Sequence, residues 1–574
     1  MIFDIEVNNR IIQAEKGETI LSALHRAGIM VPTLCSMKEL SPTGACRMCV
    51  VEVEGKPGLV PSCSYPVEEW MHIRTHSPRV IRARKLLVEL LLSNHPDDCL
   101  YCERNGNCEL QSMAEELQVR ERRIPGARMH HKLDKSSPGI VREPSKCILC
   151  GRCVRVCEEQ QAVSSIDFLH RGSQTIVGAA FNKDLNFSSC IQCGQCIMAC
   201  PTAALTEKVQ FPDLEQYLHD PSRKVVVQYS PVVANTIATE FGIKNGKQAQ
   251  GIIEAALRKM GFVHVFDSSF GTDLQIVELA HELSARLKEE RNLPLFSSCC
   301  PSWVKYAEQF HPELLSQLST SKSGQQITGS LIKSYLAEMI QASPASLYAV
   351  SIMPCISRKF ESQRAEMTQK GVSDIDMVLT TRELIRMIRL YGLNMQQMEP
   401  EKPEEMFSVS SSAGKITGAS GGLTEALIRT LHFIETGKEL RDFNALKLRG
   451  TKERKEIRLK MGERELGFVV LNGLGGVRTL LDELRSGRKD IHFVEVMACK
   501  GGCIAGGGQP IGSQENDAKL RMKSIFEADE RETLRSAHKN PSLNELFNSW
   551  LGEPYGEKCR KLLHTSFSKR EVML

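Results

Sequence analysis

Fifteen of the chain's 21 cysteines lie between residues 35 and 200, and their spacing constrains the fold more than any other feature. Two runs repeat the pattern Cys-x2-Cys-x2-Cys-x3-Cys, one over residues 147–157 and one over residues 190–200. This duplication is typical of a chain that holds two [4Fe–4S] clusters, where the fourth cysteine of each run binds the other cluster. We therefore expect one cluster on Cys147, Cys150, Cys153 and Cys200, and another on Cys190, Cys193, Cys196 and Cys157.

A third group of four cysteines lies nearer the N-terminus, in the order Cys35-x10-Cys46-x2-Cys49-x13-Cys63. Apolar residues predict a strand near Ile2–Val7, a helix that Thr19 caps at its N-terminus, and a strand over residues 48–53. Gly44 precedes the Cys-x2-Cys pair and permits a close approach of the backbone to a cluster. A strand-helix-strand unit of this kind suits a [2Fe–2S] cluster, with a structural zinc site as the alternative.

A fourth group, His95-x3-Cys99-x2-Cys102-x5-Cys108, follows a helix-like stretch over residues 80–92. One imidazole and three thiolates can complete a set of four ligands. The spacing suits either a [4Fe–4S] cluster or a zinc site of three cysteines and one histidine, and the cysteine-rich neighbourhood favours the cluster.

Composition limits the compartment and the partners. Lys and Arg number 73 against 69 Asp and Glu, a balance of +4 that argues against a dedicated nucleic-acid binder. The N-terminus has no apolar signal segment, and the most apolar short run, Leu86–Leu92, is interrupted by Glu89 and too short to span a membrane. We therefore expect no membrane span and a cytoplasmic protein, in which thiols stay reduced and clustered cysteines act as metal ligands.

After about residue 210 the pattern becomes α/β. Buried strands are predicted over residues 224–229, 263–266, 347–353, 467–471 and 492–497, and helices over residues 272–287 and 381–390. Cysteines follow several of these strands, at Cys355 and at Cys499 and Cys503, and Cys299-Cys300 follows another apolar stretch. Because carboxyl ends of strands meet at one edge of an α/β sheet, these cysteines can converge on a cofactor crevice.

The residues around these cysteines resemble three motifs of the iron–iron ([FeFe]) hydrogenases. The motifs are Ser298-Cys299-Cys300-Pro301-Ser302-Trp303, Met353-Pro354-Cys355 with Glu361, and Glu495 through Pro510. The first 209 residues resemble the accessory domains of these enzymes and also the iron–sulfur subunit of respiratory NADH:quinone oxidoreductase. The resemblance implies an α/β catalytic domain of two doubly wound lobes around an H-cluster, preceded by α+β ferredoxin-like domains.

The resemblance also implies the cofactor and the reaction. Cys300, Cys355, Cys499 and Cys503 would hold the [4Fe–4S] part of the H-cluster, with Cys503 bridging to a di-iron subsite that carries CO, cyanide and a bridging azadithiolate. One [2Fe–2S] and three accessory [4Fe–4S] clusters would pass electrons for the reversible conversion of two protons to H2. Cys299 would transfer protons, and the positions that match the pocket around the di-iron subsite are Pro231, Ser323, Gln325, Met353, Arg358 and Met497.

The proton path of the family is matched only in part. Ser319, Glu282, Arg286 and Glu361 match, but Leu279 replaces the first glutamate and cannot carry a proton. The adjacent Glu278 faces about 100° away on a helix, so a water or a side chain such as His281 would have to substitute. The usual lysine of the second motif is Arg358, followed by Lys359, and Thr417 stands where a bulky aromatic residue is usual. These differences indicate a divergent subgroup.

The predicted domains are a plant-type [2Fe–2S] domain over residues 1–79, a segment with one histidine and three cysteine ligands over 80–125, a two-[4Fe–4S] domain over 126–209, and a catalytic domain over 210–574. The resemblance implies ferredoxin or flavodoxin as redox partner, H2 and protons as substrates, and separate maturation proteins. An H2 sensor or a non-catalytic electron-transfer iron–sulfur protein of the same superfamily remains the alternative. A direct NAD(H) enzyme is disfavoured, because residues 473–476 lack the G-x-G-x-x-G spacing and predict a turn.

Two smaller features remain. The stretch from Arg120 to Lys132 is basic and could dock an acidic ferredoxin, but a solvated linker is the favoured interpretation. Cys559 belongs to no motif.

Overall fold

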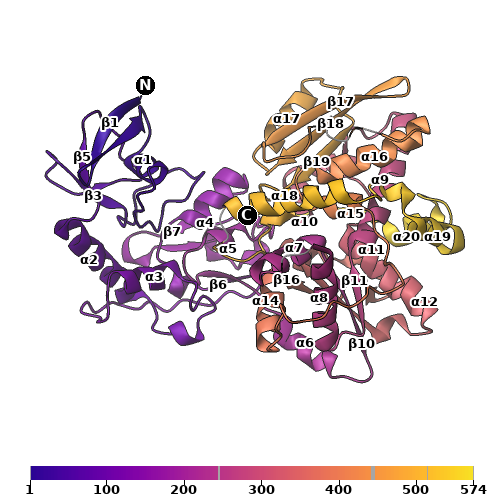
Figure 1. Cartoon of the computed structure of the whole chain (residues 1–574), viewed down its shortest axis with the longest axis horizontal. Helices are drawn as coiled ribbons and strands as arrows, with labels where there is room; N and C mark the ends of the chain where they lie inside the picture. Colours follow the sequence, from indigo (N-terminus) through magenta and orange to yellow (C-terminus); the bar gives the residue numbers. More distant parts are fainter. Residues whose placement is uncertain (1, 244–245, 441, 443–446, 513–514, 573–574) are drawn as a thin grey trace. The chain divides into compact units, whose positions relative to one another are not determined.

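A computed structural model describes residues 2–243, 246–440, 442, 447–512 and 515–572 (Figure 1). The chain divides into two compact units. Among the described residues, unit 1 comprises those up to Ser188 together with Gln195–Thr206, and unit 2 comprises Ser189–Gly194 and those from Glu207 onward. In the described part of the chain, no helix combines the length and the apolar character needed to cross a membrane.

Unit 1 begins with a five-stranded sheet in the order β2-β1-β5-β3-β4. Alternate residues of β1 and β2, such as Ile5 and Ile12, are buried against α1, so each strand has one apolar face. The side chain of Thr19 accepts a hydrogen bond from the backbone N–H of Ser22 and so caps α1, as predicted. The elements are β1 (Ile2–Val7), β2 (Arg10–Glu15), α1 (Ile20–Arg26), β3 (Val50–Val53), β4 (Val60–Pro61) and β5 (His72–Arg74).

The rest of unit 1 consists of short elements between cysteine-rich loops. The long helix predicted over residues 80–92 is α2 (Pro78–Asn94), which Ser77 caps. Strand β6 pairs with β9, and β7 pairs with β8. The remaining elements are α3 (Glu109–Glu116), β6 (Ile140–Arg142), α4 (Arg152–Arg155), β7 (Asp167–Leu169), β8 (Ile176–Gly178), α5 (Gln195–Ala199) and β9 (Leu205–Glu207).

Unit 2 contains a four-stranded parallel sheet in the order β11-β10-β13-β16. Its strands are β10 (Lys224–Tyr229), β11 (His264–Asp267), β13 (Leu347–Met353) and β16 (Met377–Thr380). Val225 and Val227 of β10 face one apolar core and Val226 faces another, so both sides of the sheet are covered. Helices on both faces are typical of a doubly wound lobe.

A second sheet of unit 2 has the order β12-β19-β18-β17 and is parallel except for the antiparallel β17–β18 pair. Its strands are β12 (Leu295–Phe296), β17 (Arg454–Met461), β18 (Arg464–Asn472) and β19 (Phe493–Met497). One core joins the two lobes, because Phe468 and Phe493 of this sheet belong to the same buried cluster as Val226 of the first sheet. A small hairpin, β14 (Thr368–Gln369) with β15 (Val372–Ser373), completes the strands.

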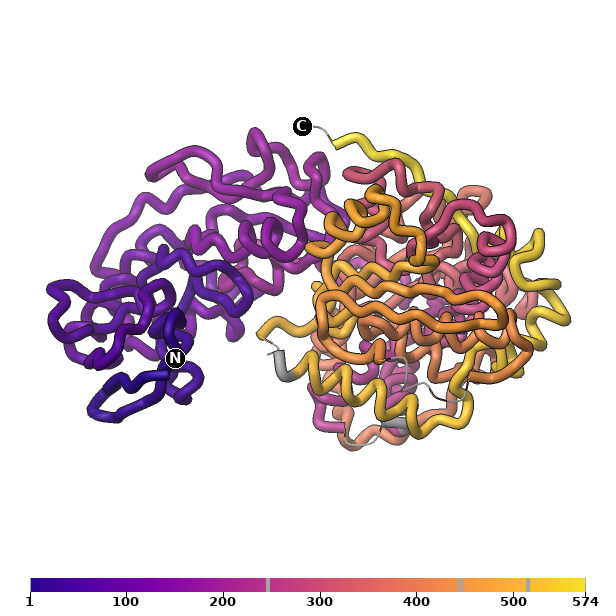
Figure 2. The backbone as a smooth tube through the Cα atoms, turned by 90° about the horizontal axis from the view of Figure 1, so that it is seen from above, coloured from indigo at the N-terminus to yellow at the C-terminus, as the bar shows by residue number. Residues whose placement is uncertain are grey.

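The helices of unit 2 cover these sheets. Helix α9 is 21 residues long and contacts both α11 and α16 inside the shared core. The helices are α6 (Phe211–Leu218), α7 (Pro231–Glu240), α8 (Gly246–Lys259), α9 (Ser269–Glu289), α10 (Pro301–Phe310), α11 (Gly324–Leu331), α12 (Ala337–Met339), α13 (Ser357–Glu361), α14 (Thr381–Leu390), α15 (Ser412–Ile416), α16 (Gly422–Thr436), α17 (Val477–Arg485), α18 (Glu515–Arg531), α19 (Pro541–Leu546) and α20 (Glu557–Leu563). Figure 2 shows the C-terminal segment, in yellow, along the periphery of unit 2.

The predicted strands and helices of this unit are confirmed, with ends that shift by at most three residues. The predicted turn over residues 473–476 is also present. The sequence patterns missed β12, β16 and β17. Strands β12 and β16 are only two and four residues long. Strand β17 is an exposed edge strand with an alternating charged face.

A buried ionic network ties the C-terminal α18 to α16. Asp529 accepts hydrogen bonds from Arg429, Arg449 and Arg535, and Glu425 accepts from Arg429 and Arg449. The side chains of Arg429 and Asp529 are both fully buried. Despite burial, the hydrogen bonds and charges of these arginines lower the pKa of Asp529 below its usual value.

We expect Asp529→Asn to destabilise unit 2 by about 3–5 kcal/mol, because it leaves buried arginines without their counter-charge. Glu530→Gln is the matched control, since Glu530 is half exposed and its pair with Arg449 should be worth less than about 1 kcal/mol. Thermal unfolding of both variants measures the difference. Because the folded-state pKa of Asp529 is lowered, the gap between wild type and Asp529→Asn should shrink as the pH falls below about 4. A gap that persists unchanged at low pH would contradict this account.

Candidate functional site

The three cysteine motifs of unit 2 meet at one cavity of about 60 Å³. Cys299, Cys355 and Cys503 line this cavity directly. Cys300 is the N-cap residue of α10 just after β12, Cys355 follows β13, and Cys499 follows β19. The loops therefore leave the carboxyl ends of strands from both sheets, which is where α/β proteins place their ligands.

The four cysteines expected to hold a cluster form one buried group. Cys499 interacts electrostatically with Cys300, Cys355 and Cys503, and the same is true of Cys300 with Cys355. Burial raises the pKa of Cys300 and Cys499, and raises that of Cys503 to about 12. Thiols that are costly to ionise in isolation need a cationic partner to become thiolates, so this donor set fits an iron–sulfur group.

Glycines allow the third motif to approach the second. A Cβ atom at Gly506 would lie 2.1 Å from the carbonyl oxygen of Pro354, so the two loops touch through bare backbone. Gly502 has φ +93° and packs closely against the carbonyl oxygen of Gly418. A Cβ at Gly507 would lie 2.4 Å from the carbonyl oxygen of Cys193, so the 189–194 segment also packs against this turn.

Arg358, and not Lys359, reaches the cavity. The Arg358 guanidinium donates to the carbonyl oxygen of Cys299 at 2.8 Å and to Glu361 at 2.6 Å. Lys359 points away and bonds Glu383 at 2.7 Å in a fully buried pair. The cation of the second motif is thus an arginine fixed by two acceptors, a geometry that a single ammonium group would not reproduce.

The other predicted pocket residues are placed as follows. Pro231, Gln325, Met353, Met497 and Thr417 line the cavity. Ser323 instead caps α11, where its side chain accepts from the N–H of Gln326. No sequence pattern pointed to the further lining residues, which include Ser230, Thr272, Gln275 and Lys415.

The predicted proton-path residues lie together, apart from one. Ser319 donates to Glu282 at 2.6 Å, and Arg286 donates to the same carboxylate at 2.7 Å. Leu279 is buried in the apolar core. Glu361 is held by Arg358 and Gln325 and makes no hydrogen bond to Glu282 among the described contacts.

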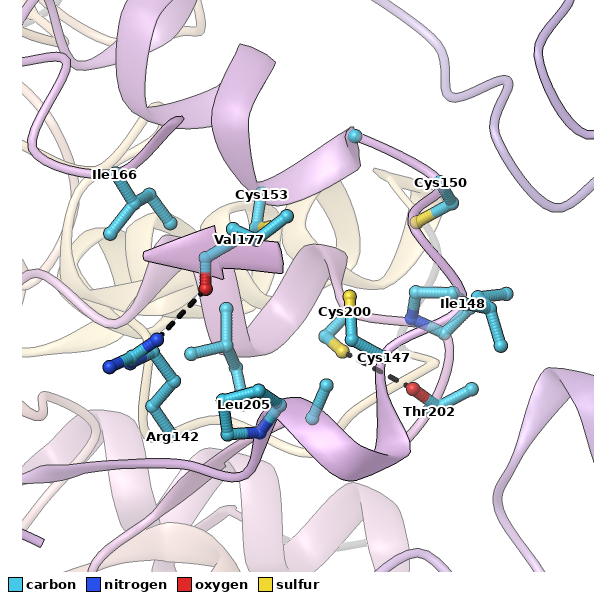
Figure 3. Close-up of a pocket in the computed structure, with 14 residues that line it drawn as sticks. Arg142, Cys147, Ile148, Cys150, Cys153, Ile166, Val177, Cys200, Thr202 and Leu205 are labelled. Carbon is cyan, nitrogen blue, oxygen red and sulfur yellow. Dashed lines mark hydrogen bonds between the residues drawn. The ribbon is translucent and has the colours of Figure 1, made fainter. Parts of the chain in front are cut away.

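In unit 1, Cys147, Cys150, Cys153 and Cys200 line one cavity of about 20 Å³ (Figure 3). The fourth cysteine of the second run thus joins the first three of the first run. Apolar side chains close the cavity, among them Ile148, Ile166 and Val177. Burial raises the pKa of Cys147 to about 12 and that of Cys150 to about 11, so this set also fits a positively charged metal group.

The N-terminal group of cysteines converges as well. Hydrogen bonds between side chains link the Cys35 thiol to those of Cys46 and Cys63, and the Cys63 thiol to that of Cys49. The backbone N–H of Cys35 donates to the sulfur of Cys46 at 3.3 Å. Gly44 has φ +61°, and a Cβ there would lie 2.9 Å from Ser64, so the loop needs glycine. These contacts link the four thiols in one group, an arrangement that a small cluster requires.

The ring nitrogens of His95 leave one lone pair that could bind a metal. Its Nδ1 pairs with the carbonyl oxygen of Pro96 at 3.2 Å, while its buried Nε2 has no hydrogen-bond partner in the described part of the chain. Burial lowers the pKa of His95, so the ring is neutral and Nε2 can offer a lone pair.

Arg155 links two of these sites within unit 1. Its buried guanidinium donates to the carbonyl oxygens of Cys35 and Ser41 in one loop, and to Cys150 in the other at 3.5 Å. The Arg155 side chain thus connects the loop that carries Cys35 with the loop that carries Cys150.

Acidic partners neutralise much of the basic stretch over residues 120–132. Arg122 and Arg128 both pair with Asp97, Arg123 pairs with Glu89, and Lys132 pairs with Asp184. This pairing favours the linker interpretation.

Comparisons with known families cover most of the chain. Residues 223–507 match "Iron only hydrogenase large subunit, C-terminal domain", and residues 515–570 match "Iron hydrogenase small subunit". In unit 1, residues 3–78 match a 2Fe-2S iron-sulfur cluster binding domain, and residues 84–123 match the iron-sulfur binding region of NADH-ubiquinone oxidoreductase-G. Residues 146–205 match a 4Fe-4S dicluster domain.

Two individual proteins match over almost the full length of the chain, and a solved structure matches part of it. The NADP-reducing hydrogenase subunit HndD of Solidesulfovibrio fructosivorans is 38% identical, over 99% of this chain and 99% of its own. Iron hydrogenase 1 of Clostridium pasteurianum is 34% identical, over 98% and 100%. A solved structure of the [FeFe]-hydrogenase HydA1 from Chlamydomonas reinhardtii has a TM-score of 0.56 and 31% identity, covering 63% of this chain and 99% of that chain.

We expect Gly506→Ala to separate the second and third motifs, because its Cβ cannot fit 2.1 Å from the Pro354 carbonyl oxygen. The variant should lose cluster iron and unfold at a lower temperature. Gly475→Ala is the control, since a Cβ at Gly475 meets nothing within 4 Å. Iron content and the unfolding midpoint of both proteins decide the matter, and a Gly506→Ala protein with full iron content would refute the packing argument.

Proposed function

This chain belongs to the iron–iron hydrogenases, and from that premise we propose which of its residues hold the metal groups and move the protons. It is an oxidoreductase that acts on H2 by the balanced reaction of two protons and two electrons to H2. The convergence of Cys300, Cys355, Cys499 and Cys503 beside one cavity, with Cys299 in its wall, is the observation that carries the residue assignment.

The proposed ligands are all thiolates apart from one imidazole. A [2Fe–2S] cluster, three accessory [4Fe–4S] clusters and the H-cluster account for them. The ligands are Cys35, Cys46, Cys49 and Cys63; His95, Cys99, Cys102 and Cys108; Cys147, Cys150, Cys153 and Cys200; Cys157, Cys190, Cys193 and Cys196; and Cys300, Cys355, Cys499 and Cys503.

Cys299 is the proposed proton carrier of the active site. When bound, the H-cluster supplies the two-electron chemistry that interconverts protons and H2. Burial and neighbouring negative charge raise the pKa of Cys299 well above its usual value, so its thiol holds a proton until a nearby base takes it. Arg358 fixes the backbone of Cys299 through its carbonyl oxygen and so orients this thiol.

The electron partner is a second part of the proposal. A ferredoxin or flavodoxin fits the accessory clusters, which accept one electron at a time. The likeness to HndD, which is named as a subunit of an NADP-reducing hydrogenase, favours a nucleotide-reducing partner subunit as a second candidate. We further propose a cytoplasmic location, maturation proteins that supply the di-iron subsite, and domain boundaries at residues 79, 125 and 209.

The decisive experiment is infrared spectroscopy of protein matured without oxygen, with H2 assays in both directions. Bands of metal-bound CO and cyanide together with turnover are expected. Their absence from fully matured protein would overturn the assignment of the H-cluster to this cavity.

Cys299→Ala should lower turnover by at least about a hundredfold, because it removes the proton donor without touching a ligand. The CO and cyanide bands serve as the internal control and should persist. An H2 assay that gives near-wild-type rates would contradict the role of this thiol.

His95→Ala should remove about four iron atoms per chain if His95 ligates a [4Fe–4S] cluster. Metal analysis distinguishes this outcome from the loss of one zinc ion, which would indicate a zinc site of three cysteines and one histidine. His130→Ala, on an exposed loop of the same unit, is the matched control and should retain all metal.

A further inference from the structure

A chain of hydrogen bonds leads from the proton-path residue Glu282 into the C-terminal segment. Thr320 donates to Glu282 at 3.2 Å through its hydroxyl, and the Nδ1 atom of His564 lies 2.8 Å from the same hydroxyl. The Nε2 atom of His564 lies 2.9 Å from Glu278. Both carboxylates are fully buried, and only 6% of the His564 side chain is exposed.

We propose that Glu278, His564 and Thr320 form a proton-relay branch that connects Glu282 to the C-terminal segment. The proposal rests on the proposed function of Glu282 in the proton path. It gives a role to Glu278, which adjoins Leu279, the residue that stands where the family has a glutamate. His564 lies in the part of the chain that matches the iron hydrogenase small subunit, so this segment would contribute to the proton path.

The relay step is balanced. When Glu282 is protonated, the Thr320 hydroxyl accepts from Glu282 and donates to Nδ1 of His564. The Glu282 proton moves to the hydroxyl oxygen of Thr320 as the Thr320 proton moves to Nδ1 of His564, and the Nε2 proton of His564 moves to Glu278. Three bonds to hydrogen break and three form, and no electron is transferred. An imidazole suits this exchange because it can hold a proton on either nitrogen near neutral pH.

The surroundings of the branch contain few other charges. The Tyr555 ring lies edge-on to His564 with ring centroids 5.3 Å apart, and the Tyr555 backbone N–H donates to Glu278. The Cys559 thiol also lies against Glu278, and His281 interacts with it electrostatically. At the other end, Arg286 pairs with Glu282. The carboxylate of Glu278 thus faces no lysine or arginine among its described hydrogen bonds and ion pairs.

A purely structural role is the competing explanation, because Glu278 also anchors the C-terminal segment through Tyr555. His564→Gln separates the two, since a glutamine amide can bond both neighbours but cannot exchange a proton between them. Thr320→Val removes only the hydroxyl, and Thr320→Ser restores it. His538→Gln is the matched control, because His538 pairs with Glu439 at 3.0 Å and with Thr430 at 3.4 Å without a hydrogen bond to Glu282.

The experiment follows two readouts in matured protein. The first is the pH profile of H2 evolution and uptake. His564→Gln and Thr320→Val should lose one titration step and about tenfold in kcat at neutral pH, while Thr320→Ser and His538→Gln follow the wild type. The second is the infrared band of protonated carboxyl groups, whose pH of appearance should move in His564→Gln and stay unchanged in His538→Gln.

Identical pH profiles and carboxyl bands in wild type, His564→Gln and Thr320→Val would overturn the branch. A failure of the H-cluster assignment gives a different result, because the wild-type protein would then lack the infrared bands of metal-bound CO and cyanide. The carboxyl band is measured in either case, so it decides on the branch independently of turnover.

Discussion

The burial of thiol groups is the constraint on which this structure depends. Burial raises the pKa of Cys300 and Cys499 near the unit 2 cavity and of Cys147 and Cys150 in unit 1, because ionised sulfur is costly in a protein interior. Packing them together is unfavourable unless cationic metal groups share them. The short elements of unit 1 and the glycine-rich turn of unit 2 allow loops that carry cysteines to approach one another closely.

Strand direction explains how unit 2 meets that constraint. Parallel strands end on the same side of their sheet, so β10, β13 and β19 deliver Pro231, Cys355 and Cys499 to neighbouring places. The shared core of α9, α11 and α16 then fixes the two lobes against each other. Loops from separate strands can therefore touch through bare backbone at Gly506, where even a methyl group does not fit.

Much of this was predictable from the sequence, because metal ligands and buried strands leave local patterns. The duplicated cysteine runs predicted the grouping that lines the Cys147 cavity, and apolar runs predicted β10 and β13 to the residue. Short strands such as β12 carry too few residues for a pattern. The motif match predicted Arg358 at the pocket, and its side chain lines the cavity, whereas no pattern predicted that Lys359 pairs with Glu383.

Contacts between residues that are far apart in the sequence could not be predicted. His564 is 286 residues from Glu278 in the sequence, and no motif connects them. Ser323 was expected at the pocket by resemblance, yet its hydroxyl is engaged in capping α11. Such assignments depend on tertiary packing, which a pattern of residue types does not encode.

The convergence of four cysteines from three loops has a consequence for how the protein is assembled. Because Cys300, Cys355 and Cys499 follow strands of different lobes, their site exists only after both lobes have packed. Metal loading is then the binding of a ligand to the native state alone, and it stabilises that state by a free energy that grows with the logarithm of the ligand concentration relative to its dissociation constant. The protein without clusters is thus the less stable form, and the clusters complete the folded structure after the two lobes have packed.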